Sequence, residues 1–327
     1  MGDKLERRGS EQPAPPVGEF YEVAGRRLFV DRQGQGRPTV VFLAGAGLCG
    51  LDFFMTQQRV ADFSSAVLYD RSGTGWSGPA PTPITSAGVT DELRLLLDQA
   101  RVERPVVLVG HSLGGLYARH YALRFPDEVT GLVLLDPGHE EYDAHMPEEL
   151  TQQQGSNMMF KLMNGLITAA LRTRPTKALL AKVPAVRRYS ELYRRLFAEE
   201  MSGWPEDVKT SLIERHGSVE WLAVGLREAS NIEARYAEVA NAGQLTDIPL
   251  IILSSIETDA FQDAVAAGVS ADLVRAELEG KSRLYDELAA SVPRGEVRPV
   301  DSGHVTIAFR HPDEVARAVR DVIRSSE

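Results

Sequence analysis

The sequence predicts an α/β fold, in which a parallel sheet carries helices on both faces and a block of helices interrupts the alternation. Two observations predict it. Short apolar runs bounded by Gly, Pro and Asp recur along the chain, as in strands that are buried on both faces. Helix-like segments alternate with these runs, except over roughly a hundred central residues where only helix-like segments occur.

The expected strands begin with a pair around Gly25, at 20–23 and 26–31. Five buried runs follow at 39–44, 66–70, 105–110, 131–136 and 249–254, and a last strand is expected at 297–301. Apolar residues at helical spacing predict helices at 89–99, 113–124 and 313–325. The central block predicts helices at 158–171, 191–201 and 219–241.

These segments divide the chain into three parts. Residues 1–18 are polar and rich in proline, so we expect a disordered leader there. Residues 19–137 and 246–327 form the expected α/β core. Residues 138–245 form the helical segment, which we expect to be a cap, or lid, over one end of the sheet.

Composition excludes several classes of function. The net charge of −10 leaves no basic stripe for nucleic acid or for an anionic membrane surface. The single cysteine, Cys49, excludes an intrachain disulfide framework and a cysteine-built metal site. Because the N-terminus has no apolar signal segment and no run reaches the ~18 residues of a membrane span, we expect a cytoplasmic protein without a membrane partner.

The most informative stretch is Gly-His-Ser-Leu-Gly at 110–114, which follows an apolar strand and opens a helix. A sharp strand-to-helix turn needs small residues on both sides of the serine, and it pushes the hydroxyl out at the carboxyl edge of the sheet. The serine also lies at a helix N-terminus, where backbone N–H groups can stabilise an oxyanion. The sequence therefore predicts Ser112 as a nucleophile.

A serine hydroxyl needs a base that is itself oriented by a carboxylate. Among the seven histidines, His304 follows a short apolar strand in Asp-Ser-Gly-His at 301–304, and a helix is expected soon after it. A loop at the carboxyl end of a strand is where an α/β sheet presents functional residues. We therefore predict His304 as the base.

These motifs resemble the α/β-hydrolase superfamily. The resemblance is carried by Val-Phe-Leu-Ala-Gly-Ala-Gly at 41–47, Asp-Arg-Ser-Gly-Thr-Gly-Trp-Ser at 70–77, Gly-His-Ser-Leu-Gly-Gly at 110–115 and Ser-Gly-His at 302–304. It implies an eight-stranded, mostly parallel sheet with a lid inserted after the sixth strand. It also implies two backbone oxyanion donors, the N–H groups of Leu113 and Ala46, although Ala44 stands where the superfamily usually has histidine.

Three carboxylates compete for the role of the acid. Asp136 closes the sixth strand, whereas Glu257 and Asp259 follow the seventh, and all three precede His304. A carboxylate at the end of a buried strand is costly unless it is paired, which favours Asp136. Haloalkane dehalogenases and some fungal lactone hydrolases of the superfamily also place their acid after the sixth strand. We favour Asp136 and keep Asp259 and Glu257 as alternatives.

The expected reaction is acyl transfer without a metal or cofactor. A serine at the elbow disfavours haloalkane dehalogenase and epoxide hydrolase chemistry, because both need a carboxylate there. The lid is rich in large apolar side chains, which indicates a small to medium hydrophobic ester or lactone. The candidate substrate contacts in the lid are Met158, Met159, Leu162, Trp204 and Trp221.

The arrangement of Ser112 and Asp136 and the Met-rich lid also resemble lactonases that open the macrolactone zearalenone. Other readings stay open. An amide or carbon–carbon bond hydrolase would use the same residues, and some plant hormone receptors use this fold to bind a small ligand without turnover. A homodimer formed through the lid also stays open.

Overall fold

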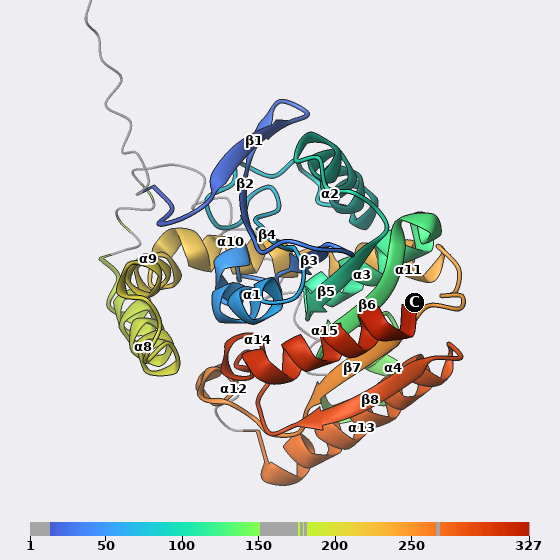
Figure 1. Cartoon of the computed structure of the whole chain (residues 1–327). Coiled ribbons are helices and arrows are strands. Elements are labelled where there is room, and N and C mark those ends of the chain that lie inside the picture. The colour runs from blue at the N-terminus through green and yellow to red at the C-terminus, as the bar shows by residue number, and fades with distance from the viewer. Residues whose placement is uncertain (1–13, 151–175, 177–178, 180–181, 266–268, 327) are drawn as a thin grey trace, which may run out of the picture.

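The computed structural model describes residues 14–150, 176, 179, 182–265 and 269–326. Its centre is one eight-stranded sheet in the order β1-β2-β4-β3-β5-β6-β7-β8 (Figure 1). The strands are β1 Glu19–Val23, β2 Arg26–Gln33, β3 Val40–Leu43, β4 Ala66–Tyr69, β5 Val106–His111, β6 Val129–Leu135, β7 Leu250–Ser255 and β8 Gly295–Val300. Only the two pairs that β2 forms, with β1 and with β4, are antiparallel, so the expected eight-stranded, mostly parallel sheet is confirmed.

Both faces of the sheet are buried, because side chains alternate along each strand. In β3, Val40 and Phe42 belong to one hydrophobic core, whereas Val41 and Leu43 belong to the other. Helices α1 (Phe54–Ala61) and α15 (Pro312–Ser326) close the first core. Helices α2 (Ser86–Gln99), α3 (Leu113–Arg124) and α13 (Ala271–Ala290) close the second. Strands that are buried on both faces have apolar side chains at every position. Their sequences are therefore continuous apolar runs, which is the pattern that predicted these strands.

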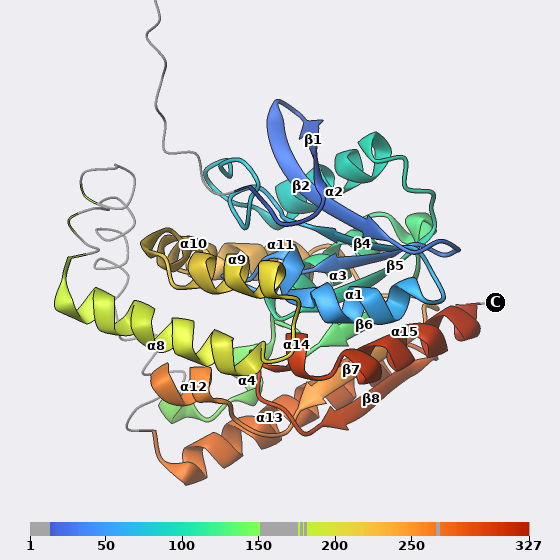
Figure 2. The same ribbon diagram turned by 60° about the vertical axis from the view of Figure 1, so that its left-hand side comes forward.

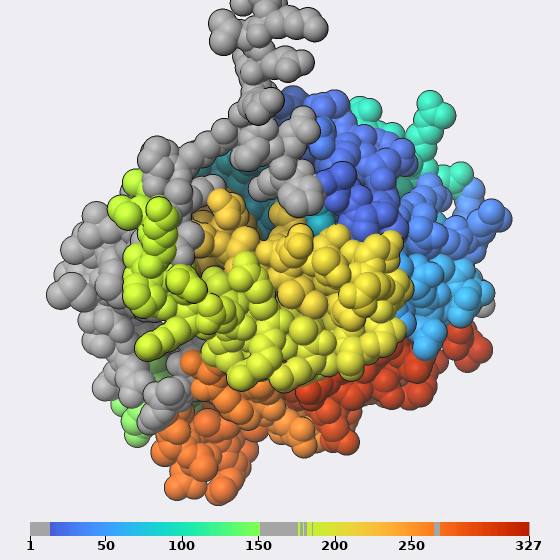
Figure 3. Space-filling view, turned by 90° about the vertical axis from the view of Figure 1, so that its left-hand side faces the viewer, coloured from blue at the N-terminus to red at the C-terminus, as the bar shows by residue number. Residues whose placement is uncertain are grey.

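Only helices occur among the described residues between β6 and β7. They are α4 Tyr142–His145, α8 Pro184–Glu200, α9 Glu206–His216, α10 Val219–Ala229 and α11 Ile232–Ala240. Helices α8, α9 and α10 lie together at one end of the sheet (Figure 2). In the space-filling view, α8 and α9 cover the middle of that face (Figure 3). We call α8–α11 the helical block.

One expected helix is divided in the structure, and several of the observed helices were not predicted. The segment 219–241 is two helices rather than one, because Ser230 is extended (ψ 145°) and Asn231 is left-handed (φ 56°), a conformation that asparagine tolerates. Helix α13 was not predicted, although Ser270 marks its start by accepting a hydrogen bond from the Leu273 amide. The expected helix at 158–171 lies outside the described residues, as do residues 1–13 of the expected leader, whereas Val17 packs against the core.

The remaining short elements are η1 Gly50–Phe53, η2 Pro126–Glu128, α12 Ala260–Val265 and α14 Ile307–Arg310. In the described part of the chain, no helix combines the length and the apolar character needed to cross a membrane.

The register brings the ends of the central strands to one edge. His111 at the end of β5 pairs with Leu135 of β6, and Ser255 at the end of β7 pairs with Val300 of β8. The segments that follow these strands therefore meet at the carboxyl edge of the sheet, where parallel α/β proteins place their ligand sites.

Candidate active site

Ser112 stands on a strained turn between β5 and α3. Its backbone has φ 50° and ψ −121°, a combination that few non-glycine residues adopt. A Cβ atom on Gly114 would lie 2.0 Å from the Leu43 carbonyl oxygen, and one on Gly110 would lie 2.6 Å from the Gly114 carbonyl oxygen. The two glycines of the motif are thus required by close backbone contacts, and these contacts hold the serine at the edge of the sheet.

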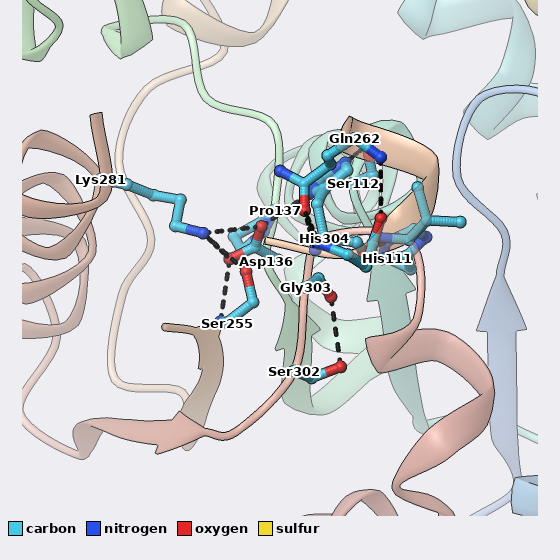
Figure 4. A network of polar contacts seen from close by, with 12 residues as sticks. His111, Ser112, Asp136, Pro137, Ser255, Gln262, Lys281, Ser302, Gly303 and His304 are labelled. Carbon is cyan, nitrogen blue, oxygen red and sulfur yellow. Dashed lines mark hydrogen bonds and ion pairs between the residues drawn. The ribbon is translucent and has the colours of Figure 1, made fainter. Parts of the chain in front are cut away.

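The structure brings Ser112, His304 and Asp136 together from three separate strand ends (Figure 4). The Ser112 Oγ lies 3.0 Å from His304 Nε2, and His304 Nδ1 lies 2.6 Å from Asp136 Oδ2. The imidazole therefore connects the serine hydroxyl with a buried carboxylate. Asp136 also has a positive φ, 44°, so a second strained residue lies at the site.

Asp136 is held by more than His304. Its Oδ1 accepts the Ser255 amide N–H at 3.1 Å, and Lys281 Nζ from α13 lies 2.9 Å from the same oxygen. Lys281 also donates to the Ser255 hydroxyl at 2.6 Å (Figure 4). Burial alone would raise the pKa of Asp136, but the charge of Lys281 and the bond to His304 outweigh it and hold that pKa well below its usual range.

Lys281 was not predicted from the sequence. It lies on α13, which was not predicted, and 145 residues separate it from Asp136 along the chain. A lysine with only 8% of its side chain exposed is unusual, since buried lysines need a charged partner. No local sequence pattern identifies Asp136 as the partner of Lys281. The one available signal is a lysine on the apolar face of the segment that forms α13, since a buried lysine requires a carboxylate nearby.

The two alternative carboxylates lie elsewhere. Asp259 Oδ2 accepts the backbone N–H groups of Val305 and Thr306 at 2.8 and 3.0 Å, so it supports the loop that carries His304. Glu257 is exposed. Within the described ranges, neither carboxylate forms a hydrogen bond or ion pair with the His304 imidazole.

The His111 side chain packs beside His304. The ring centroids are 5.1 Å apart, and His111 Nε2 donates to the His304 carbonyl oxygen at 2.7 Å. Burial, with a smaller contribution from the nearby His304, lowers the pKa of His111 to about 4. His111 is therefore neutral at physiological pH and supports the His304 loop through its N–H group.

The two expected oxyanion donors are free to bind a ligand. No hydrogen bond in the described part of the chain uses the amide N–H of Ala46 or of Leu113. Ala46 is the one exposed residue in the buried stretch 40–50, and it lines the same cavity as Ser112 and His304.

This cavity has a volume of about 620 Å³ and is lined mainly by apolar and aromatic side chains. Those from α8, α10 and α12 include Tyr189, Tyr193, Phe197, Trp221, Leu226 and Phe261. Trp221, one of the candidate substrate contacts, is thus a lining residue. Trp204 does not line the cavity, because its ring packs against Phe54 at a centroid distance of 6.4 Å in the core. Met158, Met159 and Leu162 lie outside the described residues.

One group of side chains in the described part of the chain has the spacing of metal ligands. Ligand atoms of Cys49, Asp52 and His216 lie within 4.8 Å of one another, and all three residues are buried. His216 Nε2 already bonds Asp52 Oδ1 at 2.8 Å, and burial keeps the pKa of the Cys49 thiol well above its usual range. A protonated thiol is a poor metal ligand, so this group fits a hydrogen-bonded contact between η1 and α9.

Comparison with known proteins gives a family. A model described as "Alpha/beta hydrolase family" matches residues 40–318. A pimeloyl-[acyl-carrier protein] methyl ester esterase of Chromobacterium violaceum is 41% identical over 108 residues, which are 33% of this chain and 40% of that protein. The uncharacterized protein YqjL of Bacillus subtilis is 31% identical over 132 residues, 40% of this chain and 52% of that protein. The matches thus span about half of these relatives or less.

Solved structures match over more of the chain. An epoxide hydrolase from Vigna radiata has a TM-score of 0.65 at 16% identity and covers 94% of this chain and 98% of its own. A thermophilic esterase from Thermogutta terrifontis has a TM-score of 0.58 at 19% identity and covers 95% of this chain and 99% of its own. At these identities the likeness shows a shared fold.

Proposed function

The chain belongs to the alpha/beta hydrolase family, and from that premise we propose that it is a serine hydrolase that cleaves a hydrophobic carboxylic ester or lactone. One observation carries the proposal. Ser112 stands on a strained elbow with its Oγ 3.0 Å from His304 Nε2, in a largely apolar cavity. A hydroxyl, a base and an oriented carboxylate in this geometry are the components of acyl transfer.

In the first half of the reaction, the Ser112 Oγ attacks the carbonyl carbon of the substrate while its proton passes to His304 Nε2. The oxyanion that forms accepts hydrogen bonds from the N–H groups of Ala46 and Leu113. Asp136 accepts the Nδ1–H of His304 and stabilises the imidazolium, and its low pKa keeps it ionised throughout. His304 then gives its proton to the leaving alkoxide, and an acyl-enzyme remains.

In the second half, His304 takes a proton from water and the resulting hydroxide attacks the acyl carbon. The same two amides stabilise the second oxyanion. When it collapses, the proton on His304 returns to Ser112 and the carboxylic acid leaves. The bonds formed and broken in these two steps require no metal or cofactor.

The cavity supports a hydrophobic substrate. Its volume of about 620 Å³ lies within the range of sites for ligands of drug size. Its aromatic lining from the helical block supports the proposal that the block acts as a lid over the site. A macrocyclic lactone such as zearalenone is one member of the proposed class, and a simple alkyl ester is another.

Two of the structurally similar proteins are named for different reactions, ester hydrolysis and epoxide hydrolysis. Epoxide opening on this fold needs a carboxylate as nucleophile, because it forms an alkyl-ester intermediate. Ser112 supports ester cleavage instead. An amide or carbon–carbon bond hydrolase would use the same residues, so a substrate panel must separate these from an esterase. A receptor would bind its ligand without turnover.

The decisive test is Ser112→Ala with p-nitrophenyl esters of increasing chain length and a macrocyclic lactone. We expect kcat to fall by roughly 10⁶-fold, because the substitution removes the nucleophile itself. Labelling of Ser112 by a fluorophosphonate, read by mass spectrometry, should disappear in parallel. Ser202→Ala, at an exposed serine in the helical block, is the control and should keep wild-type rates. Equal turnover by wild type and Ser112→Ala would reject the function.

A further inference from the structure

The loop that carries the proposed oxyanion donor Ala46 is held by a buried arginine. Arg71 follows β4, and its guanidinium reaches the loop after β3 through two hydrogen bonds. Its Nη1 donates to the Ala44 carbonyl oxygen at 2.5 Å, and its Nη2 donates to the Gly45 carbonyl oxygen at 2.7 Å. The guanidinium fork is planar and rigid, so two bonds to adjacent carbonyls fix the orientation of the loop.

The other side of the loop is held by helix α10 of the helical block. Glu228 Oε1 pairs with Arg71 Nε at 2.6 Å, and its Oε2 accepts the Gly47 amide N–H at 2.9 Å. Trp221, two turns earlier on the same helix, donates its indole N–H to the Gly47 carbonyl oxygen. The Arg71 and Glu228 side chains are 5% and 3% exposed, so water does not screen this pair.

The Ala46 amide of the loop takes part in none of these contacts. The carbonyls of Ala44, Gly45 and Gly47 accept from side chains, and the Gly47 N–H donates to Glu228. The Ala46 N–H has no acceptor in the described part of the chain. It belongs to the same peptide unit as the Gly45 carbonyl that Arg71 binds. A charged donor on that carbonyl polarises the peptide and makes its N–H a stronger donor.

Helix α10 is itself anchored to the elbow helix. Arg235 of α11 donates to the Glu228 carbonyl oxygen and, at 2.8 Å, to the hydroxyl of Tyr117 on α3. Arg235 is fully buried. The position of Glu228 is therefore tied to the helix that begins at Ser112, which fixes the two proposed oxyanion donors relative to each other.

We propose that Arg71 and Glu228 are positioning residues for the Ala46 oxyanion donor, and that helix α10 is therefore part of the catalytic scaffold. The inference rests on the proposed serine hydrolase function. In this chain Ala44 stands where the resembled superfamily usually has histidine, and the Arg71–Glu228 pair supplies side-chain support to the same loop. Undocking of the helical block removes that support, so docking of the block and stabilisation of the oxyanion are coupled.

Glu228→Gln is the sharpest test, because it keeps the shape of the side chain. The glutamine amide has one acceptor, its oxygen, and one donor, its NH₂ group. It therefore cannot accept hydrogen bonds from Arg71 at one end and from the Gly47 N–H at the other. We expect kcat to fall by about 10²-fold, as for loss of an oxyanion donor, with KM within about threefold of wild type. The inhibition constant of a trifluoromethyl ketone, which adds Ser112 to form an oxyanion, should rise by a similar factor. The binding of the matching methyl ketone should not change.

Glu140→Gln is the matched control. Arg119 and Glu140 form another largely buried bidentate pair, at 2.8 and 2.9 Å, with no contact to the loop. Its loss should lower the melting temperature but leave kcat and trifluoromethyl ketone affinity at wild-type values. Trp221→Phe removes a neutral donor to Gly47 and should give a smaller loss of kcat in the same direction, which keeps the test available if Glu228→Gln does not fold.

The outcomes separate this inference from the function on which it rests. If Glu228→Gln and Trp221→Phe change only KM, or affect kcat no more than Glu140→Gln does, the positioning role is rejected while the serine hydrolase function stands. If Ser112→Ala keeps wild-type turnover, the function itself is rejected. A parallel loss of kcat and of trifluoromethyl ketone affinity in folded Glu228→Gln supports the inference.

Discussion

The two sides of the proposed active site are built from different parts of the chain. On the acid side, Asp136 is bound by His304, Ser255 and Lys281, which lie on strand ends and on a helix that packs against the sheet. On the oxyanion side, the loop around Ala46 is bound by Glu228 and Trp221 of the helical block. Both sides use a buried ion pair, but only the second draws a partner from outside the core.

This difference separates two functions of the scaffold. Ser112, His304 and Asp136, the residues of the proposed proton transfer, all lie in the core. Stabilisation of the oxyanion requires α10 to be docked. We therefore expect changes on the acid side to alter the pH dependence and changes on the oxyanion side to alter the affinity for oxyanion-forming inhibitors.

Among changes to the residues that support the nucleophile, the largest effect is expected for Asp136→Asn, which removes the carboxylate that orients His304. We expect kcat/KM to fall by about 10⁴-fold, because an amide at this position favours the wrong tautomer of the imidazole. The measurement is steady-state hydrolysis of the best p-nitrophenyl ester.

Glu257→Gln is the control for this change. The exposed Glu257 carboxylate does not touch His304, so its loss should leave kcat/KM within about twofold of wild type, as surface substitutions usually do. A large loss in Glu257→Gln together with a small one in Asp136→Asn would reverse the assignment of the acid.

An intermediate effect is expected at His111, which contacts both sides of the site. Its Nε2 bonds the His304 carbonyl, and a Cβ atom on Gly45 of the oxyanion loop would lie 2.5 Å from its Nδ1. Burial lowers the pKa of His111 to about 4 in the folded protein, whereas the usual value is 6.5. Above pH 6.5 neither state is protonated, so no stability is lost. As the pH falls from 6.5 towards 4, only the unfolded state binds the proton and the folded state loses stability.

The loss from this one group approaches about 3 kcal/mol near pH 4, at 1.36 kcal/mol for each unit of pKa difference. His111→Gln keeps a donor for the His304 carbonyl but cannot titrate. Urea unfolding of both proteins between pH 7 and pH 4.5 should therefore show a steeper loss of unfolding free energy for wild type. Parallel curves would contradict the assignment of a neutral, buried His111.

The smallest effect is expected for Lys281→Met. Removing the cation raises the pKa of Asp136 towards its usual range, but the carboxylate stays ionised at neutral pH. Because the site loses a positive charge, uptake of a proton there becomes more favourable, and the acid limb of the kcat/KM profile should move to higher pH. Activity at pH 8 and the affinity for a trifluoromethyl ketone should change little, because the oxyanion side is untouched.

Lys281→Arg keeps the charge and should restore the wild-type pH profile. If Lys281→Met leaves the pH profile of kcat/KM unchanged, or moves its acid limb to lower pH, the proposed electrostatic role of Lys281 is rejected. If it weakens trifluoromethyl ketone binding instead, the two sides of the site are not independent as the geometry indicates.

The sequence by itself determined the features that depend on neighbouring residues. Buried strands need continuous apolar runs, and the elbow needs Gly110 and Gly114 where the backbone contacts itself, so strand positions and Ser112 could be predicted locally. The predicted sheet agrees with the observed one strand by strand. The same reasoning missed the break at Asn231, because asparagine is compatible with both a helix and a left-handed turn.

Only the tertiary structure decided which charges meet. Three candidate carboxylates precede His304, and only the assembled sheet brings Asp136 within 2.6 Å of its imidazole. Lys281 is 145 residues from Asp136, and Glu228 is 157 residues from Arg71. The physical reason is that periodicity encodes burial and local conformation, whereas the partner of a buried charge depends on strand order and helix docking. These exist only after the chain has folded.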